Sequence, residues 1–262
     1  MNNIILIDGD ILLYQISASA EQPFYWGDDL WTLHADEREV KEQIDNEVTA
    51  LKTHLNAKRV IIALSGETNW RKFVLPTYKS NRKGTRKPVV YRAAKDYVRS
   101  VYEVSEYPNL EADDVLGIIA TDKKVRGDKI IVSADKDLKT IPGLLYNPDK
   151  PELGIQEISR EQADWNHMYQ TLVGDTADGY TGCPGVGPKT AEKVLNGLQS
   201  SQLWEAVVSA YTDAGLSEAE ALTQAIVSRI LRCGEYDPSA HLVHFWTPNE
   251  PRKAPQSASS NL

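Results

Sequence analysis

Short apolar runs alternate with longer, more polar segments over the first 158 residues. Mainly apolar runs, each of the length of a buried strand, lie at 3–7, 59–64, 129–133 and 143–146. Segments with helix-favouring composition lie at 11–20, 36–55, 89–104 and 111–124. Because strands and helices alternate, the pattern predicts an α/β fold with a mainly parallel central sheet and helices on both faces.

The pattern changes after about Ser159, where strand signals stop. The remaining periodic segments, at 161–173, 188–198, 202–214 and 217–231, all predict helices. We therefore predict an α/β domain over residues 1–158 and a helical subdomain over 159–247. From Pro248 onward, Pro, Ser, Asn and Gln dominate, which predicts a disordered tail over 248–262.

Composition is that of an ordinary globular protein, with 41% hydrophobic and 25% charged residues among 262. No apolar run approaches the roughly 20 residues that span a bilayer, so we expect no membrane association. The run at 3–7 is cut off by Asp8, which argues against a signal peptide. The two cysteines, Cys183 and Cys233, indicate a reducing, cytoplasmic compartment without a disulfide framework.

The net charge of −8 conceals a strongly basic segment. Residues 70–99 hold ten Lys and Arg side chains and one acid, Asp96. Aromatic residues stand among the cations, as is typical of segments that bind phosphates and single strands. The candidate DNA contacts are Arg71, Lys72, Tyr78, Lys79, Arg82 and Lys83. Because Pro76, Gly84 and Pro88 interrupt the segment, we predict a loop or arch over about 70–90.

Acidic residues form four clusters along the chain. These are Asp8 with Asp10, Glu111 with Asp113 and Asp114, Asp135 with Asp137, and Asp175 with Asp178. The first three clusters lie where a predicted strand ends or a helix begins, positions that meet at one edge of a parallel sheet. Carboxylates gathered there would repel one another unless divalent cations neutralised them. The clusters therefore predict a metal-dependent site for phosphoryl transfer or nuclease chemistry. Helix capping by Glu111 to Asp114, and a phosphatase with Asp8 as nucleophile, remain alternatives.

A glycine-rich turn precedes the predicted helix at 188–198. Gly185 and Gly187 permit a tight turn, and Pro188 suits the first helical position. Lys189 and Thr190 then lie at a helix N-terminus, which attracts phosphate. This pattern predicts a helix-hairpin-helix that holds a DNA backbone without reading bases.

In this order, the motifs resemble those of the structure-specific 5′ nuclease superfamily, which includes flap endonucleases. The resemblance is more specific to the 5′→3′ exonucleases of short-tailed, T-odd-type bacteriophages. It covers residues 4–247 through the segments 7–10, 69–72, 78–82, 111–114, 133–142, 174–182, 185–189 and 225–232. It implies a PIN-like 5′ nuclease fold.

The resemblance also implies the site residues and ions. Two Mg²⁺ ions are expected, with Mn²⁺ as a substitute. Asp8, Glu111 and Asp113 would hold the first ion, and Asp135, Asp137 and Asp178 the second. Asp114 and Asp175 would assist through water. Lys79 and Arg82 would contact the scissile phosphate, with Arg71 as a weaker candidate, and backbone carbonyls around 182–187 would bind K⁺.

The chain departs from the family pattern after its second predicted strand. The family carries an Asp there as a ligand of the first metal, whereas this chain reads Ser65-Gly66-Glu67. Glu67 is the candidate replacement, and an Asp restored at position 66 is expected to be neutral or favourable.

These observations predict a metal-dependent 5′→3′ exodeoxyribonuclease that acts as a monomer on 5′ ends of duplex DNA, in the host cytoplasm if it is phage-encoded. A flap endonuclease and an RNase H-like activity on RNA·DNA hybrids remain open. So does a catalytically weakened DNA-end-binding protein, for which Gly66 is the only support.

Overall fold

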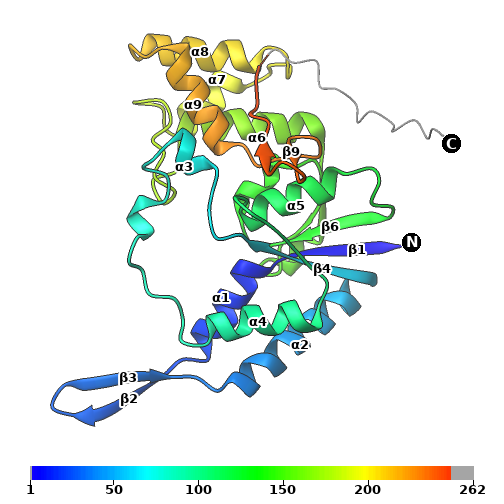
Figure 1. Ribbon diagram of the computed structural model, residues 1–262. Coiled ribbons are helices and arrows are strands. Elements are labelled where there is room, and N and C mark those ends of the chain that lie inside the picture. Colours follow the sequence, from blue (N-terminus) through cyan, green and yellow to red (C-terminus); the bar gives the residue numbers. More distant parts are fainter. Residues whose placement is uncertain (1, 249–262) are drawn as a thin grey trace.

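A six-stranded sheet lies at the centre of the computed structural model, which describes residues 2–248 (Figure 1). The strand order is β5-β4-β1-β6-β7-β8. Its strands are β1 (Asn3–Asp8), β4 (Ala57–Ser65), β5 (Val104–Tyr107), β6 (Asp128–Val132), β7 (Gly143–Tyr146) and β8 (Ile155–Ile158). All neighbouring pairs are parallel except β7 with β8. The predicted fold class, an α/β protein with a mainly parallel sheet, is confirmed.

Helices cover both faces of the sheet, so its central strands are buried on both sides. The helices of this part are α1 (Gly9–Ser19), α2 (Glu37–His54), α4 (Tyr91–Val101) and α5 (Ala112–Thr121). Successive side chains of β1 point to opposite faces. Ile5 and Ile7 pack with the core beneath α1, α2 and α4, whereas Ile4 and Leu6 pack with the core beneath α5.

The C-terminal helices form a separate group beside α5 (Figure 1). They are α6 (Arg160–Val173), α7 (Pro188–Leu195), α8 (Leu203–Asp213) and α9 (Glu218–Ser228), and they share a core of their own. Two short strands follow, β9 (Tyr236–Asp237) and β10 (Leu242–Val243). The expectation that no strand follows Ser159 was therefore wrong. The domain boundary at 158/159 stays a prediction.

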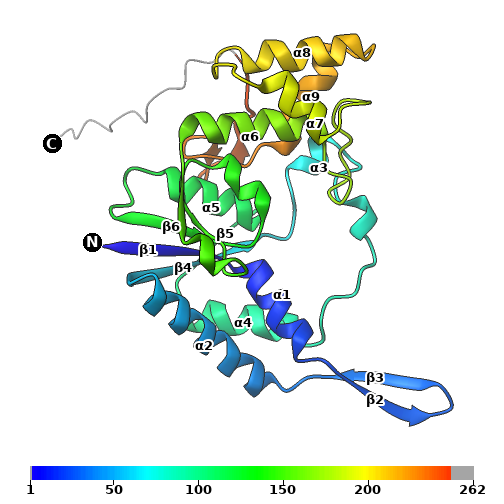
Figure 2. The same cartoon turned by 180° about the vertical axis from the view of Figure 1, so that it is seen from behind.

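The main element that the hydrophobic pattern failed to predict is a two-stranded hairpin, β2 (Gln22–Gly27) with β3 (Leu30–His34). Its residues are exposed on both faces, so they lack the alternation that a half-buried strand produces. The hairpin projects from the body of the molecule in both views (Figures 1 and 2).

Several predicted boundaries shift. The helix expected over 89–104 ends at Val101, and β5 follows it. The helix expected over 111–124 spans 112–121. Strand β8, which was not expected, ends directly before Ser159, where the predicted helical subdomain begins. The basic segment is broken, as predicted: α3 (Arg71–Val74) is followed by turns at 76–79 and by a short 3-10 helix, η1 (Ser80–Arg82), and residues 85–88 have no regular structure. Further 3-10 helices are η2 (Lys136–Thr140) and η3 (Pro151–Leu153).

Residues 249–262, nearly all of the predicted tail, lie outside the described part of the chain. Among residues 2–248, no helix has both the length and the apolar character that crossing a membrane would require.

Candidate active site

The carboxyl ends of the parallel strands meet at one edge of the sheet, where a cleft of about 1520 Å³ opens. Asp8 is the last residue of β1, Ser65 is the last residue of β4, and Ser133 follows β6. The cleft collects acids from all four clusters of the sequence, Asp8, Asp10, Glu111, Asp113, Asp135, Asp137, Asp175 and Asp178, and Glu67 lines it as well. Of the eight predicted metal ligands, only Asp114 does not line it.

Crowding raises the pKa of several of these carboxyl groups. Burial, reinforced by the charges of Asp10 and Asp135, raises the pKa of Asp8 to about 6. Burial and the charge of Asp135 raise the pKa of Asp137 to about 7. Burial and the charges of Asp8 and Asp135 hold the pKa of Asp113 well above its usual range. A cation between these groups would relieve the repulsion.

The base of the arch, residues 78–82, places three donors against two of the acids. The Lys79 ammonium contacts Glu111 and lies 3.5 Å from Asp178, and the Tyr78 hydroxyl lies within hydrogen-bonding distance of both carboxylates, 2.9 Å from Glu111 and 3.2 Å from Asp178. Arg82 donates to Asp178 at 2.5 Å. Burial works against the charge of Glu111, but Arg71 and Lys79 lower its pKa to about 2. Cationic side chains and carboxylate oxygens thus share one cleft.

The arch base is fastened to the loop that carries Asp175 and Asp178. Lys79 has a left-handed backbone (φ 51°), and its N–H donates to the Asp178 carbonyl at 2.7 Å. The Asn81 amide donates to the Ala177 carbonyl at 3.1 Å. Gly179 allows the two segments to approach this closely, because a Cβ there would lie 2.7 Å from the Thr77 carbonyl oxygen. The contact fixes the position of the cations relative to the acids.

Asp114 and Arg71 have a structural role, which corrects two predictions. The Asp114 carboxylate is fully buried and accepts from Arg71, from the Trp70 indole and from the Leu231 N–H. All five guanidinium N–H groups of Arg71 are used, by Asp114, Glu111 and the Val227 and Arg229 carbonyls. Neither side chain has capacity left for a metal-bound water or a DNA phosphate.

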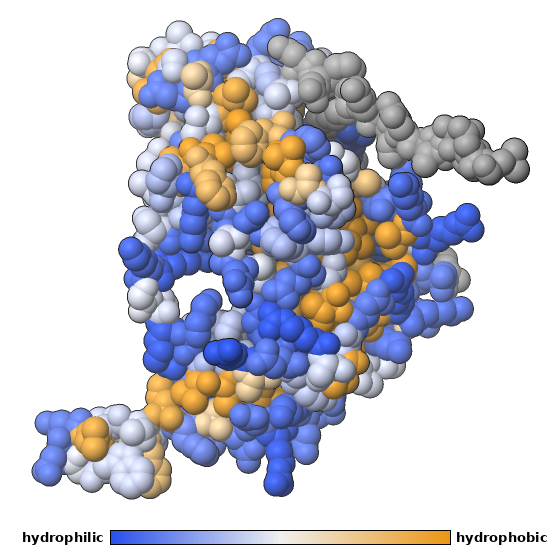
Figure 3. All heavy atoms as spheres, in the orientation of Figure 1, coloured by the Kyte–Doolittle hydropathy of each residue, from blue (hydrophilic) through white to orange (hydrophobic). Residues whose placement is uncertain are grey.

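Among the other predicted DNA contacts, Tyr78 is also corrected. Its ring is buried, so it cannot stack on a base, and it acts instead through its hydroxyl. Lys72 and Lys83 are exposed at the cleft wall. Phe73, which no motif of the sequence marks, is 80% exposed beside Lys72. In Figure 3, hydrophilic side chains gather along the edge where the arch crosses the opening.

The predicted helix-hairpin-helix lies between α6 and α7, away from the cleft. Gly185 has φ +78°, as expected, but Gly187 is extended at φ −90° and precedes Pro188 at the start of α7. A Cβ at either glycine would meet nothing within 4 Å, so the turn presents bare backbone to solvent. Lys189 and Thr190 are exposed at the helix N-terminus.

Some residues of the site could not be found from the sequence. The Gln170 amide on α6 donates to Asp137 at 2.8 Å, and no motif marks it. Three partners of Asp10 were likewise not predicted: the Tyr91 hydroxyl and the Ser65 N–H donate to its carboxylate, and Lys95 pairs with it. Only the tertiary structure brings these groups together.

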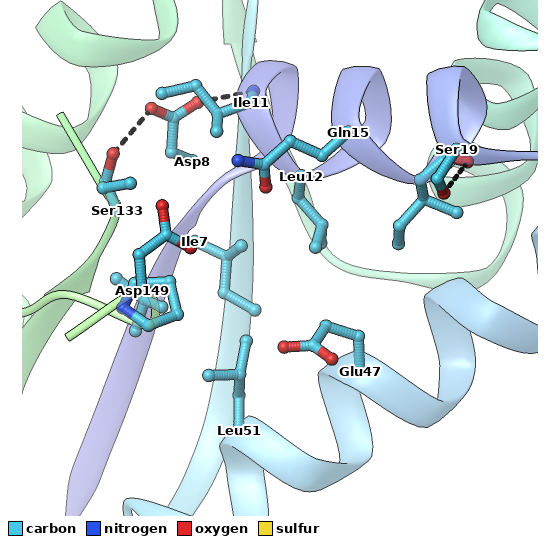
Figure 4. Close-up of a pocket in the computed structure, with 14 residues that line it drawn as sticks. Ile7, Asp8, Ile11, Leu12, Gln15, Ser19, Glu47, Leu51, Ser133 and Asp149 are labelled. Atoms are coloured by element: carbon cyan, nitrogen blue, oxygen red, sulfur yellow. Dashed lines mark hydrogen bonds between the residues drawn. The ribbon is translucent and has the colours of Figure 1, made fainter. Parts of the chain in front are cut away.

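A second cavity, of about 350 Å³, is lined by Asp8 together with residues of α1 and α2 (Figure 4). In that view, Asp8 accepts from the Ile11 N–H and the Ser133 hydroxyl, while Gln15, Glu47 and Asp149 line the hollow. These two bonds hold the Asp8 carboxylate at the boundary between the two cavities.

The donor set fits a hard divalent cation, because every candidate ligand is a carboxylate oxygen. Within residues 2–248, however, no three His, Cys, Asp or Glu side chains are already arranged to hold a metal ion. Lys79, Arg82 and Tyr78 occupy oxygens of Glu111 and Asp178, so these carboxylates must turn to take a metal.

Comparison with known proteins identifies the family. The family model described as the 5′-3′ exonuclease, N-terminal resolvase-like domain, matches residues 3–143. The exodeoxyribonuclease of Enterobacteria phage T3 is 32% identical over 94% of this chain and 93% of its own length. The chain belongs to the 5′–3′ exonuclease family. It is thus a nuclease, as the sequence predicted.

A second relative of this 5′–3′ exonuclease and one solved structure are informative. The exonuclease of Escherichia phage T7 is 31% identical over 94% of this chain and 93% of its own length. The bacteriophage T5 D15 flap endonuclease, in a complex with DNA and metal ions, has a TM-score of 0.64 at 15% identity. That similarity covers 87% of this chain and 89% of the T5 chain, and it shows a shared fold.

The departure at Gly66 has a steric cause in this exonuclease. A Cβ at Gly66 would lie 2.4 Å from the Tyr107 carbonyl oxygen. An Asp therefore cannot replace Gly66 without a backbone shift, which corrects the expectation that Asp is neutral or favourable there. Glu67, exposed on the cleft wall, is the acid that this segment offers.

If Glu67 replaces the missing Asp as a ligand, Glu67→Gln is expected to raise the Mg²⁺ concentration needed for half-maximal cleavage by about tenfold, because the variant loses that carboxylate. The measurement is a Mg²⁺ titration of the cleavage rate, with Glu103→Gln, at an exposed position directly before β5, as the control. An unchanged titration would show that the exonuclease works without this ligand.

Proposed function

We propose that the protein hydrolyses phosphodiesters at 5′ ends of duplex DNA as a divalent-metal-dependent 5′→3′ exodeoxyribonuclease. One observation carries the proposal: carboxylates from four distant segments converge at the strand ends, directly beneath an arch base that holds Lys79 and Arg82. The family membership and the T5 complex with DNA and metal ions support it.

Two Mg²⁺ ions, for which Mn²⁺ substitutes, are proposed to bind the cleft. Asp8, Glu111 and Asp113 are assigned to the first ion, and Asp135, Asp137 and Asp178 to the second, with Asp175 assisting through water. The ions would supply an activated water and stabilise charge on the attacking and leaving oxygens. Gln170 would hold Asp137 in place through its amide, 2.8 Å from the carboxylate.

Lys79 and Arg82 are proposed to move from the carboxylates to the scissile phosphate. The Lys79 ammonium is already 3.5 Å from Asp178, and Arg82 is half exposed above it. Because the Lys79 backbone is fastened to the Asp178 carbonyl, a small rotation of the side chain is sufficient to redirect the charge. Lys72 and Lys83 would contact neighbouring phosphates from the cleft wall.

The turn between α6 and α7 is proposed to hold the duplex backbone away from the reaction. Its exposed backbone at Gly185 and Gly187, with Lys189 and Thr190 at a helix N-terminus, suits a phosphate. K⁺ bound to backbone carbonyls of 182–187 would order the same turn.

Lys79→Ala is expected to lower kcat by about 10²- to 10³-fold even with saturating DNA, because it removes charge from the reacting phosphate. Lys189→Ala should instead raise KM severalfold and reduce the salt slope of binding by about one unit. Single-turnover rates at saturating enzyme separate the two effects. Slower chemistry in Lys189→Ala, with only weaker binding in Lys79→Ala, would contradict this division of roles.

The function itself is tested by the products from a 5′-labelled duplex in Mg²⁺. Mononucleotides support an exonuclease, longer oligomers would indicate a flap endonuclease, and cutting of an RNA·DNA hybrid would indicate an RNase H-like activity. An untouched substrate would contradict the proposal and favour an end-binding protein. We further propose that the protein acts as a monomer in the host cytoplasm.

A further inference from the structure

The hairpin β2–β3 has no role in the site described above. Its two strands pair only with each other, and the hairpin stands clear of the body in Figures 1 and 2. Isolated two-stranded ribbons are marginally stable in water, so a projecting hairpin of this kind calls for an explanation.

The hairpin exposes an unusual amount of aromatic surface. The side chains of Phe24, Tyr25, Trp26 and Trp31 are 54%, 52%, 64% and 59% exposed. Phe24 pairs with Trp26 on one face, and Tyr25 pairs with Trp31 on the other. Such pairs stabilise a ribbon, but they leave aromatic rings open to solvent on both faces. Single-stranded nucleic acids bind to rings of this kind, because every base has a face that stacks.

The root of the hairpin is joined to the basic arch. Both terminal nitrogens of Arg86 donate to the Glu21 carboxylate, at 2.6 and 2.7 Å, and the Val89 N–H donates to Glu21 at 2.7 Å. The neighbouring arch residues Thr85 and Lys87 line the acidic cleft. The hairpin therefore begins where the cleft ends, and a strand that leaves the cleft on this side meets it.

Charge along the hairpin is compatible with a nucleic acid at its root. The two strands carry no Asp, Glu, Lys or Arg. The acids of the turn, Asp28 and Asp29, lie at the tip, farthest from the arch cations (Figure 1). A polyanion is thus attracted at the root, meets uncharged aromatic surface along the strands, and is repelled only at the tip.

We propose that the hairpin β2–β3 binds the single-stranded 5′ tail of a DNA substrate by base stacking. The inference rests on the proposed function, because the tail is the part of a substrate that continues past the cleft. Arch cations neutralise its first phosphates, and the rings of the hairpin stack its bases without sequence preference. Strands of five or six residues extend roughly 17–20 Å, enough for about five stacked nucleotides.

Tryptophan fluorescence tests the contact without any cleavage. Trp26 and Trp31 are the exposed tryptophans of the hairpin, so the difference between the wild type and Trp26→Phe/Trp31→Phe isolates their signal. In EDTA, oligo(dT) is expected to quench this component. An unquenched component would overturn the proposal, whatever the enzyme does to duplex DNA.

Affinity provides the second arm. Trp26→Ser/Trp31→Ser should weaken binding of a duplex with a ten-nucleotide 5′ tail by about tenfold and leave blunt duplex unchanged. Leu153→Ser, which alters an exposed apolar residue of η3, is the control and should change neither. Equal loss of affinity for both substrates would overturn the tail contact. No loss for either substrate would also overturn it and would favour a protein partner for the hairpin.

A milder variant guards against loss of the hairpin itself. Asp28 and Asp29 both have positive φ, which Asn tolerates, so Asp28→Asn/Asp29→Asn should keep the turn. Removing these charges should increase the affinity for tailed DNA severalfold at low salt. Unchanged affinity would contradict the proposal that the single-stranded tail runs along the hairpin to its tip. If the wild type binds tails and shows the quench but cuts no DNA, only the proposed function fails.

Discussion

Asp137→Asn is expected to reduce cleavage by at least about 10³-fold while duplex binding persists or tightens. The exchange keeps the shape of the side chain but removes the charge that Asp137 is proposed to supply to the second metal. Loss of a negative charge also lessens the repulsion of phosphate. Cleavage and binding measured on the same preparation check both parts, and substantial Mg²⁺-dependent turnover would contradict the assignment.

The same variant should be more stable than the wild type in EDTA. Because burial and the charge of Asp135 raise the pKa of Asp137 from 3.8 to about 7 in the folded state, this carboxyl group lowers stability progressively as the pH rises between those values, and the cost is complete above about pH 7. Asp137→Asn should therefore raise the melting temperature by several degrees at pH 8. The gain should shrink towards pH 5, where the wild-type carboxyl group is protonated in the folded state. Asp149→Asn, at an exposed acid of the second cavity, is the matched control.

Arg71→Met is expected to destabilise the fold by about 3–5 kcal/mol, because it leaves the Asp114 carboxylate buried without its partner. The Val227 and Arg229 carbonyls lose a donor at the same time. Urea unfolding measures the loss. Lys72→Met, at the exposed neighbouring position, should change stability by no more than about 0.5 kcal/mol.

The double variant Arg71→Met/Asp114→Asn should recover part of the loss, because no uncompensated charge then remains in the core. Full recovery is not expected, since Arg71 also binds Glu111. If Arg71→Met unfolds like the wild type and only weakens DNA binding, the structural role assigned to Arg71 is wrong.

The central strands were predictable because burial on both faces requires continuous apolar runs. The run at 3–7 coincides with β1 apart from its last residue, and the run at 59–64 lies within β4. The hairpin at 22–34 was missed because its rings face solvent on both sides. A polar-apolar pattern reports burial, and a strand that buries nothing produces no such signal.

The acids of the site were predictable for a similar reason. Asp8 ends β1, Glu111 precedes α5 and Asp135 precedes η2, so chain order alone directs them towards one edge of the sheet. The cations were less predictable. Arg71 and Lys72 are adjacent in a basic run, yet one is buried and the other exposed, because α3 turns one of them into the core. Composition cannot distinguish the two.

The sequence by itself determined the fold class, the family and the kinds of side chain available for chemistry, because these depend on local runs and on motif order. Only the tertiary structure decided which charges are free to act. It paired Arg71 with Asp114, fastened Lys79 to the Asp178 loop and left Gly66 no room for a side chain. Each of these contacts joins residues that lie between 41 and 99 positions apart, and no local pattern along the chain encodes such a contact.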